Sequence, residues 1–252
     1  MPGPIRTPAP LPFPCPVTPL PQALPPGVRE VVLFGGTFDP PHAAHLNLAL
    51  AAREQSPWRD AWLIFVPAAQ SPLKGHGPHA PEQDRVEMVR LLLASHEGGP
   101  PPRTMIWTDE IDRARVAPGP TYTIDTVRRL RSILPKEIKI RLLIGSDQAA
   151  DFHRWRDARE LEKQTRPITL MRAPHRTIGD LSAAIRAPRF WTSAHIANWL
   201  ARVPLNLSME GSSTEARDLL REPNPTPEQQ ARLDQLLTPA VHRYIREQGL
   251  YR

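Results

Sequence analysis

The chain has 252 residues, 40% of them hydrophobic, which is enough to bury a substantial core in one α/β domain or two small ones. Its net charge of +6 suits an anionic partner, but no dense Lys/Arg block with interleaved aromatics supports nucleic-acid binding. The single cysteine, Cys15, excludes an internal disulfide framework and a cysteine-based zinc site. No apolar run is as long as a membrane span, and proline interrupts every apolar stretch near the N-terminus. We therefore expect a cytoplasmic protein without a membrane or nucleic-acid partner.

The first 27 residues alternate proline with small or apolar residues. Proline lacks a backbone N–H and favours polyproline II, so this stretch suits neither a sheet nor a helix. We predict a disordered extension over 1–27 and a single domain over 28–252. A docking arm for a partner is the alternative for the extension.

The most informative stretch follows at once. An apolar run, Val31 to Phe34, breaks on Gly35-Gly36, turns through Asp-Pro-Pro and enters a helical pattern over 43–54. The run is typical of a buried parallel strand, and glycines let the backbone approach a ligand closely. The first N–H groups of a helix attract phosphate, and His42 and His45 share one helix face there. The stretch therefore predicts a phosphate-handling site.

The rest of the chain alternates predicted strands with predicted helices. Further strands are expected at 61–67, 104–108, 138–144 and 166–171. Further helices are expected at 84–94, at about 123–133 with Thr123 or Asp125 as its cap, and within 239–252. Because strand, helix and strand in this order form right-handed parallel crossovers, we expect an α/β fold with a Rossmann-like, doubly wound parallel sheet.

Several later residues have both a chemical and an ordinary interpretation. Lys74 lies in a loop after a predicted strand, where open α/β sheets bind ligands, but such a lysine can equally be a solvated surface residue. The run Gly211 to Arg217 can be a capped helix start or a phosphate cradle. Trp155 can pack in the core. Trp191 and Trp199 are expected in a surface-packed helix or insert without chemistry.

Two motifs together carry a family resemblance. The string GGTFDPPHAAH near the start and SSTEAR near the end resemble the signatures of the nucleotidylyltransferases, and most closely those of their nicotinate-nucleotide adenylyltransferase branch. PTYTIDTV and the C-terminal YIREQGLY resemble further elements of that branch. The likeness covers most of 29–252 and thins between 173 and 205. The chain departs from the family at Ala44, Leu73, Arg156 and Ala216, where glycine, histidine, an aromatic residue and isoleucine are usual.

The resemblance implies a role for each matching position. Those expected at ATP are Gly35, Gly36, Thr37, Phe38, His42, His45, Gly145, Asp147, Ser212, Ser213, Thr214 and Arg217. Those expected at the nicotinate nucleotide are Thr37, Lys74, Tyr122, Thr123, Trp155 and Arg156. Catalysis is expected from His45, His42, Lys74 and Arg217, with His45 most important at the transition state and His42 orienting the β- or γ-phosphate.

The implied reaction is adenylyl transfer from ATP to nicotinate mononucleotide, which gives nicotinate adenine dinucleotide and pyrophosphate in NAD biosynthesis. Mg²⁺ should arrive with ATP, because no carboxylate cluster suggests a metal cage. Nicotinamide mononucleotide, alone or beside the acid, is an alternative acceptor, and phosphopantetheine is a more distant one. A nucleotide-binding regulatory protein that has lost turnover is the alternative of another class. A homo-oligomer is compatible with the sequence.

Overall fold

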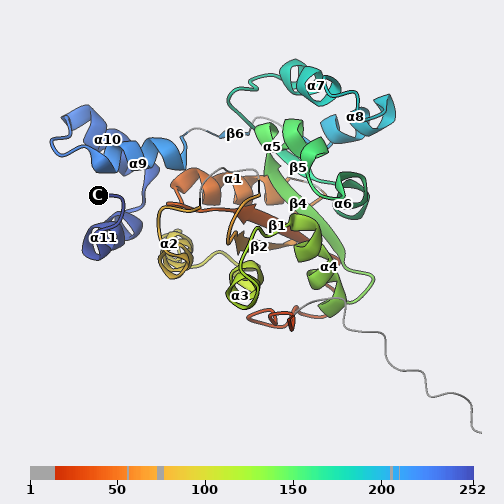
Figure 1. Ribbon diagram of the computed structural model, residues 1–252, viewed down its shortest axis with the longest axis horizontal. Coiled ribbons are helices and arrows are strands. Elements are labelled where there is room, and N and C mark those ends of the chain that lie inside the picture. Colours follow the sequence, from red (N-terminus) through yellow and green to blue (C-terminus); the bar gives the residue numbers. More distant parts are fainter. Residues whose placement is uncertain (1–14, 56, 73–76, 205–206, 210) are drawn as a thin grey trace, which may run out of the picture.

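A computed structural model describes residues 15–55, 57–72, 77–204, 207–209 and 211–252. Its described residues contain one six-stranded sheet whose paired strands are all parallel, in the order β3-β2-β1-β4-β5-β6 (Figure 1). The strands are β1 (Glu30–Gly36), β2 (Trp62–Pro67), β3 (Thr104–Ile106), β4 (Lys139–Gly145), β5 (Ile168–Arg172) and β6 (Ser208–Met209). The strand order reverses between β1 and β4, and such a reversal opens a crevice at the carboxyl ends of the strands. The predicted doubly wound α/β fold is confirmed.

Helices cover both faces of the sheet (Figure 1). They are α1 (Ala43–Glu54), α2 (Glu82–Ala94), α3 (Asp109–Val116), α4 (Thr123–Ile133), α5 (Ser146–Asp151), the 3-10 turn η1 (Phe152–Arg154), α6 (Ala158–Thr165), α7 (Ile178–Arg186), α8 (Ser193–Leu200), α9 (Ser213–Arg221), α10 (Pro227–Leu236) and α11 (Pro239–Gln248). Alternate side chains of β1 enter opposite cores, because successive residues of a strand face opposite ways. Val31 and Leu33 pack with α4, α6, α7 and α8, whereas Val32 and Phe34 pack with α1, α2 and α9 to α11.

Two expectations about the elements were wrong, and helix α3 occupies a segment for which no element is expected from the sequence. The N-cap of α4 is Tyr122, and its side chain makes no capping hydrogen bond, so neither Thr123 nor Asp125 caps this helix. Trp191 and Trp199 are only 7% and 0% exposed, because they pack with Phe152 in the core under α7 and α8 rather than on the surface.

The proline-rich segment also differs from the prediction over part of its length. Residues 1–14 lie outside the described residues. Residues 15–27 are not disordered: Val17, Leu20 and Leu24 pack against the core, and this red segment lies beside α3 and α4 in Figure 1. Within the described residues, no helix is long and apolar enough to cross a membrane. The boundary of the domain at residue 28 stays a prediction.

Candidate active site

A cavity of about 560 Å³ opens at the carboxyl ends of β1 and β4, where the strand order reverses. One wall comes from the turn after β1 and the start of α1, and a second from the turn after β4 and the end of β5. The start of α9 and the start of α4 form two further walls, and described residues of the loop after β2 and around η1 complete the lining. Four backbone turns or helix starts therefore point into one space.

The two histidines of the first motif lie together at the start of α1. His42 is the N-cap residue, and its backbone N–H donates to Nδ1 of His45 over 3.1 Å. The ring centroids are 3.7 Å apart. Because Nδ1 of His45 accepts a hydrogen bond, a neutral His45 carries its proton on Nε2. His45 also lines the cavity, so it is suited to donate that proton to an anion.

His42 is held neutral by its surroundings. It is only 1% exposed, and its Nδ1 has no hydrogen-bond partner among the described residues. Burial, reinforced by the charge of Arg172, lowers the pKa of His42 from 6.5 to about 4, although Glu215 opposes the shift. At neutral pH this imidazole is therefore a dipole with an unpaired polar atom and not a cation.

Asp39 ties this wall together. Its buried carboxylate accepts from the backbone N–H groups of His79 and Ala80 and from the hydroxyl of Tyr251, at 2.7, 3.0 and 2.8 Å. Burial alone would raise the pKa of Asp39, but these hydrogen bonds leave it below its ordinary value. The C-terminal tyrosine and the loop before α2 are thereby fixed against the turn that follows β1.

The start of α9 lies against the turn that carries the histidines, and it also lines the cavity. Ser212 caps α9 by accepting from the backbone N–H of Glu215, and Ser213 donates to the carbonyl of Pro40 over 2.8 Å. Arg217 donates to the carbonyl of Asp39 over 2.6 Å, while its buried Nε has no partner among the described residues. A cation and a helix N-terminus are thus held beside α1, and together they favour a bound phosphate.

The turn after β4 leaves little space around Gly145. A Cβ added there would lie 2.6 Å from Cδ of Arg172 and 2.6 Å from Oδ1 of Asp147. Arg172 and Asp147 form an ion pair of 3.0 Å, and both are about one-third exposed at the cavity. Glycine lets the backbone approach a ligand here, and Asp147 offers carboxylate oxygens to donors such as hydroxyls.

Aromatic side chains form the wall near α4 and η1. Trp155 stacks on Phe152 with centroids 4.7 Å apart, so only the opposite face of its indole ring is available to a planar ligand. The Arg156 guanidinium lies 4.3 Å from the centroid of the Tyr122 ring, a cation–π contact. Thr123 begins α4, where the first backbone N–H groups have no partner within the helix. This wall suits a flat ring that carries an anionic group.

All the residues expected at the site, except Lys74, line this one cavity; they are Gly35, Gly36, Thr37, Phe38, His42, His45, Tyr122, Thr123, Gly145, Asp147, Trp155, Arg156, Ser212, Ser213, Thr214 and Arg217. Lys74 lies outside the described residues, and so does Leu73. Phe38 is only 1% exposed and packs beside His45, so it shapes the turn. Ala216 is fully buried, in agreement with a packing role for that position. What each residue contacts in a ligand stays a prediction.

Other cavity residues were not identified from the sequence. Arg172 ends β5 at the same carboxyl edge of the sheet as Gly145. Open α/β sheets bind ligands at the carboxyl ends of their strands, and this rule could have identified Arg172 from the sequence. Glu110 is buried between the hydroxyls of Thr121 and Thr126 and also lines the cavity, but no local pattern marks it. Asp39 lies inside the first motif, yet its partners are distant in sequence.

The arrangement can hold polyanions and align them. Helix starts, two imidazoles and the guanidinium groups of Arg172 and Arg217 supply donors and positive charge. Among the described residues, no group of three or more His, Cys, Asp or Glu side chains could hold a metal ion. A metal that reaches the cavity on a phosphate chain needs no such group, because Mg²⁺ usually retains waters and substrate oxygens.

The sequence pattern of the cytidylyltransferase-like family matches residues 33–218. A protein of Chromobacterium violaceum named probable nicotinate-nucleotide adenylyltransferase is 35% identical over 232 residues, which is 88% of this chain and 99% of that protein. A protein of the same name from Gloeobacter violaceus is 34% identical, over 87% of this chain and 94% of that protein.

Solved structures give the same picture of the fold. The Plasmodium falciparum nicotinic acid mononucleotide adenylyltransferase complexed with NaAD superposes with a TM-score of 0.64 at 17% identity. The match covers 88% of this chain and 97% of that one. A putative nicotinate-nucleotide adenylyltransferase from Vibrio parahaemolyticus gives a TM-score of 0.57 at 15% identity, over 89% and 96% of the two chains.

Proposed function

The chain belongs to the nicotinate-nucleotide adenylyltransferases within the cytidylyltransferase-like family, and we propose that it transfers the adenylyl group of ATP to nicotinate mononucleotide. The products are nicotinate adenine dinucleotide and pyrophosphate. One observation supports this most: a single cavity combines a histidine pair and two helix N-termini with an aromatic wall. The first group suits a triphosphate, and the second suits a pyridine ring.

The reaction needs alignment and charge stabilisation more than base catalysis. The phosphate of the acceptor is largely ionised at neutral pH, because its second pKa is about 6. One of its oxygens attacks the α-phosphorus of ATP, and the bond from that phosphorus to the oxygen bridging to the β-phosphate breaks, so pyrophosphate leaves. Placing the two anions in line supplies much of the rate, and fixed donors supply the rest.

Each group of residues has a place in this scheme. We assign Nε2–H of His45 to the charge that develops on the transferring phosphoryl group. The start of α9 and Arg217 then hold the departing pyrophosphate, while Gly145 and Asp147 receive the adenosine. Lys74 is assigned to the phosphates from its motif alone. MgATP is the substrate, and the metal travels with it.

The aromatic wall is assigned to the acceptor. The open face of Trp155 stacks the pyridine ring, and the first backbone N–H groups of α4 take its carboxylate. Arg156 lies over Tyr122 at the rim, where its charge attracts an acidic ring. These assignments favour nicotinate over nicotinamide mononucleotide. The cytoplasmic location also stays a prediction.

Pyrophosphate release tests the proposal with one acceptor at a time. Purified protein receives MgATP and then nicotinate mononucleotide, nicotinamide mononucleotide or phosphopantetheine. Release that is strongest with nicotinate mononucleotide supports the proposal. Comparable rates with both pyridine nucleotides would show that the acceptor site does not distinguish the acid from the amide. Release only with phosphopantetheine, or none at all from protein that still binds ATP, would contradict it.

A further inference from the structure

The proline-rich arm, residues 15–24, closes over a buried ion pair. Arg129 of α4 binds Asp109 of α3 through Nε at 2.7 Å and Nη2 at 2.8 Å, and these side chains are only 1% and 0% exposed. The guanidinium also donates to the arm, where the carbonyls of Cys15 and Pro16 accept from Nη1 and Nη2 of Arg129 at 3.1 and 2.7 Å. The arm therefore supplies two acceptors to this buried guanidinium.

Thr18 is the most heavily bonded residue of the arm. Its backbone N–H donates to Asp109 over 2.9 Å, and its hydroxyl donates to Asp112 over 3.0 Å. Its carbonyl accepts from the indole N–H of Trp107, a side chain that is 1% exposed. The N–H, the carbonyl and the hydroxyl of Thr18 are therefore all hydrogen-bonded to α3 or to the residue Trp107 just before it.

A short chain of contacts leads from this anchor to the cavity. Glu110, next to Asp109, accepts from the hydroxyls of Thr121 and Thr126 at 2.7 and 2.6 Å. Thr121 immediately precedes Tyr122, the N-cap of α4. The first turn of α4 is therefore fixed on one side by Glu110, and Arg129 fixes the same helix one turn farther along.

We propose that the arm is a positioning element for the acceptor side of the active site. It holds α3 and the start of α4 in the arrangement that binds the pyridine nucleotide, an inference that rests on the proposed function. The ATP side is built from the turn after β1, the start of α1, β4, β5 and α9. The arm makes none of its hydrogen bonds to these elements among the described residues. The family pattern begins at residue 33, so the arm lies outside the part of the chain that this pattern matches.

The physical reason is the environment of the buried pair. Without the arm, the pair loses hydrogen-bond partners while it is still partly desolvated, which favours arrangements of α3 and α4 that reach water. A ligand that needs the docked arrangement then binds more weakly, in proportion to the fraction of molecules that retain it. Acceptor binding should therefore respond to changes in the arm, and ATP binding should not.

The test uses single substitutions in the full chain. Thr18→Pro removes the N–H donor and the hydroxyl together, and Thr18→Ser keeps both. Ala23→Pro is a matched control, because Ala23 is an exposed arm residue whose N–H donates to no described acceptor. Steady-state kinetics give the KM for each substrate, and urea unfolding shows that each variant is folded.

We expect Thr18→Pro to raise the KM for nicotinate mononucleotide about tenfold, the order expected for an unsatisfied buried group. The KM for ATP should stay within about twofold, and Thr18→Ser and Ala23→Pro should match the parent. Equal shifts in both KM values, or no shift, would overturn the proposal. If Thr18→Pro does not fold, Thr18→Val replaces it, because this variant loses only the hydroxyl. It should raise the KM for nicotinate mononucleotide about threefold and leave the KM for ATP unchanged. A KM for nicotinate mononucleotide equal to that of the parent would overturn the proposal.

Amide hydrogen exchange separates this inference from the proposed function. Exchange in peptides over 121–126 is measured without substrates, and Thr18→Pro should accelerate it while Ala23→Pro should not. Unchanged exchange would overturn the positioning role even in an active enzyme. Absence of product with the parent protein would instead contradict the proposed function and leave the exchange result intact.

Discussion

The neutral state of His42 makes the protein sensitive to mild acid. The pKa of His42 falls from 6.5 to about 4 on folding, chiefly because the ring is buried. Below pH 6.5 the unfolded chain takes up a proton that the folded chain refuses, so lowering the pH favours unfolding. This contribution to stability is fully present above pH 6.5 and is lost as the pH falls towards about 4.

The magnitude follows from the two pKa values. The complete shift corresponds to roughly 3 kcal/mol, of which roughly 2 kcal/mol is lost between about pH 7.5 and about pH 5. His42→Asn removes the titrating group and retains a good N-cap residue for α1. Acidic residues such as Asp39 titrate in both proteins, so their effects cancel in the comparison.

Urea unfolding of the parent and of His42→Asn at the two pH values measures the difference. The free energy of unfolding of the parent should fall by roughly 2 kcal/mol more than that of the variant on acidification. If the two proteins lose the same free energy to within about 0.5 kcal/mol, the reasoning about His42 is wrong.

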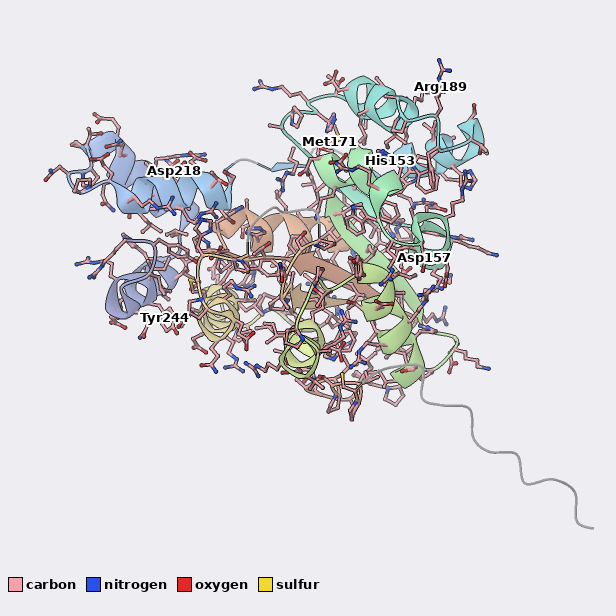
Figure 2. The ribbon with its side chains drawn as sticks, viewed as in Figure 1. His153, Asp157, Met171, Arg189, Asp218 and Tyr244 are labelled. Atoms are coloured by element: carbon pink, nitrogen blue, oxygen red, sulfur yellow. The ribbon has the colours of Figure 1, made fainter. Side chains whose placement is uncertain are left out.

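Three further predictions concern other parts of the site. His45→Ala should lower turnover by about 10²- to 10³-fold and change the KM for ATP little, because the His45 donor acts on the transition state. The control is His153→Ala, at a histidine of η1 labelled in Figure 2, which should keep near-parental turnover; similar rates for both variants would remove His45 from the mechanism. Gly145→Ala should raise the KM for ATP about tenfold, because the added Cβ would lie 2.6 Å from both Arg172 Cδ and Asp147 Oδ1. In the control Gly179→Ala the nearest atom lies 3.5 Å from the added Cβ, so the KM for ATP should not change. An unchanged KM in both variants would argue against close approach of ATP to the turn after β4. Tyr251→Phe should lower the free energy of unfolding by about 1–2 kcal/mol, because buried Asp39 loses a donor. Tyr244 of α11, labelled in Figure 2, donates to Asp84 of α2 in a less buried hydrogen bond, so Tyr244→Phe should lower it less; the opposite order in urea melts would refute this reasoning.

The residues that the sequence marks for the site meet in one cavity because their motifs are local. The turn after β1 and the start of α1 lie within 16 consecutive residues, Val31–Leu46, and strand, glycine and helix signals coincide there. Parallel strands place the ends of β1, β4 and β5 at one edge of the sheet, so motifs far apart in sequence meet without further information.

The missed features depend on partners far along the chain. Asp39 receives the hydroxyl of Tyr251 across 212 positions, and Arg129 binds the arm across more than 100. Proline content predicted disorder for that arm, but its carbonyls complete a buried ion pair that local propensity does not register. Trp199 is buried because α7 and α8 fold back over Phe152, a contact that only the tertiary structure reveals.

The fate of the α-phosphorus of ATP tests the central proposal most directly. The protein is incubated with MgATP labelled at the α-phosphorus and with nicotinate mononucleotide, and the products are separated. We expect the label in nicotinate adenine dinucleotide, in amounts equal to the pyrophosphate released. Label that remains in ATP, or that appears in AMP or ADP while the acceptor is unchanged, would contradict adenylyl transfer.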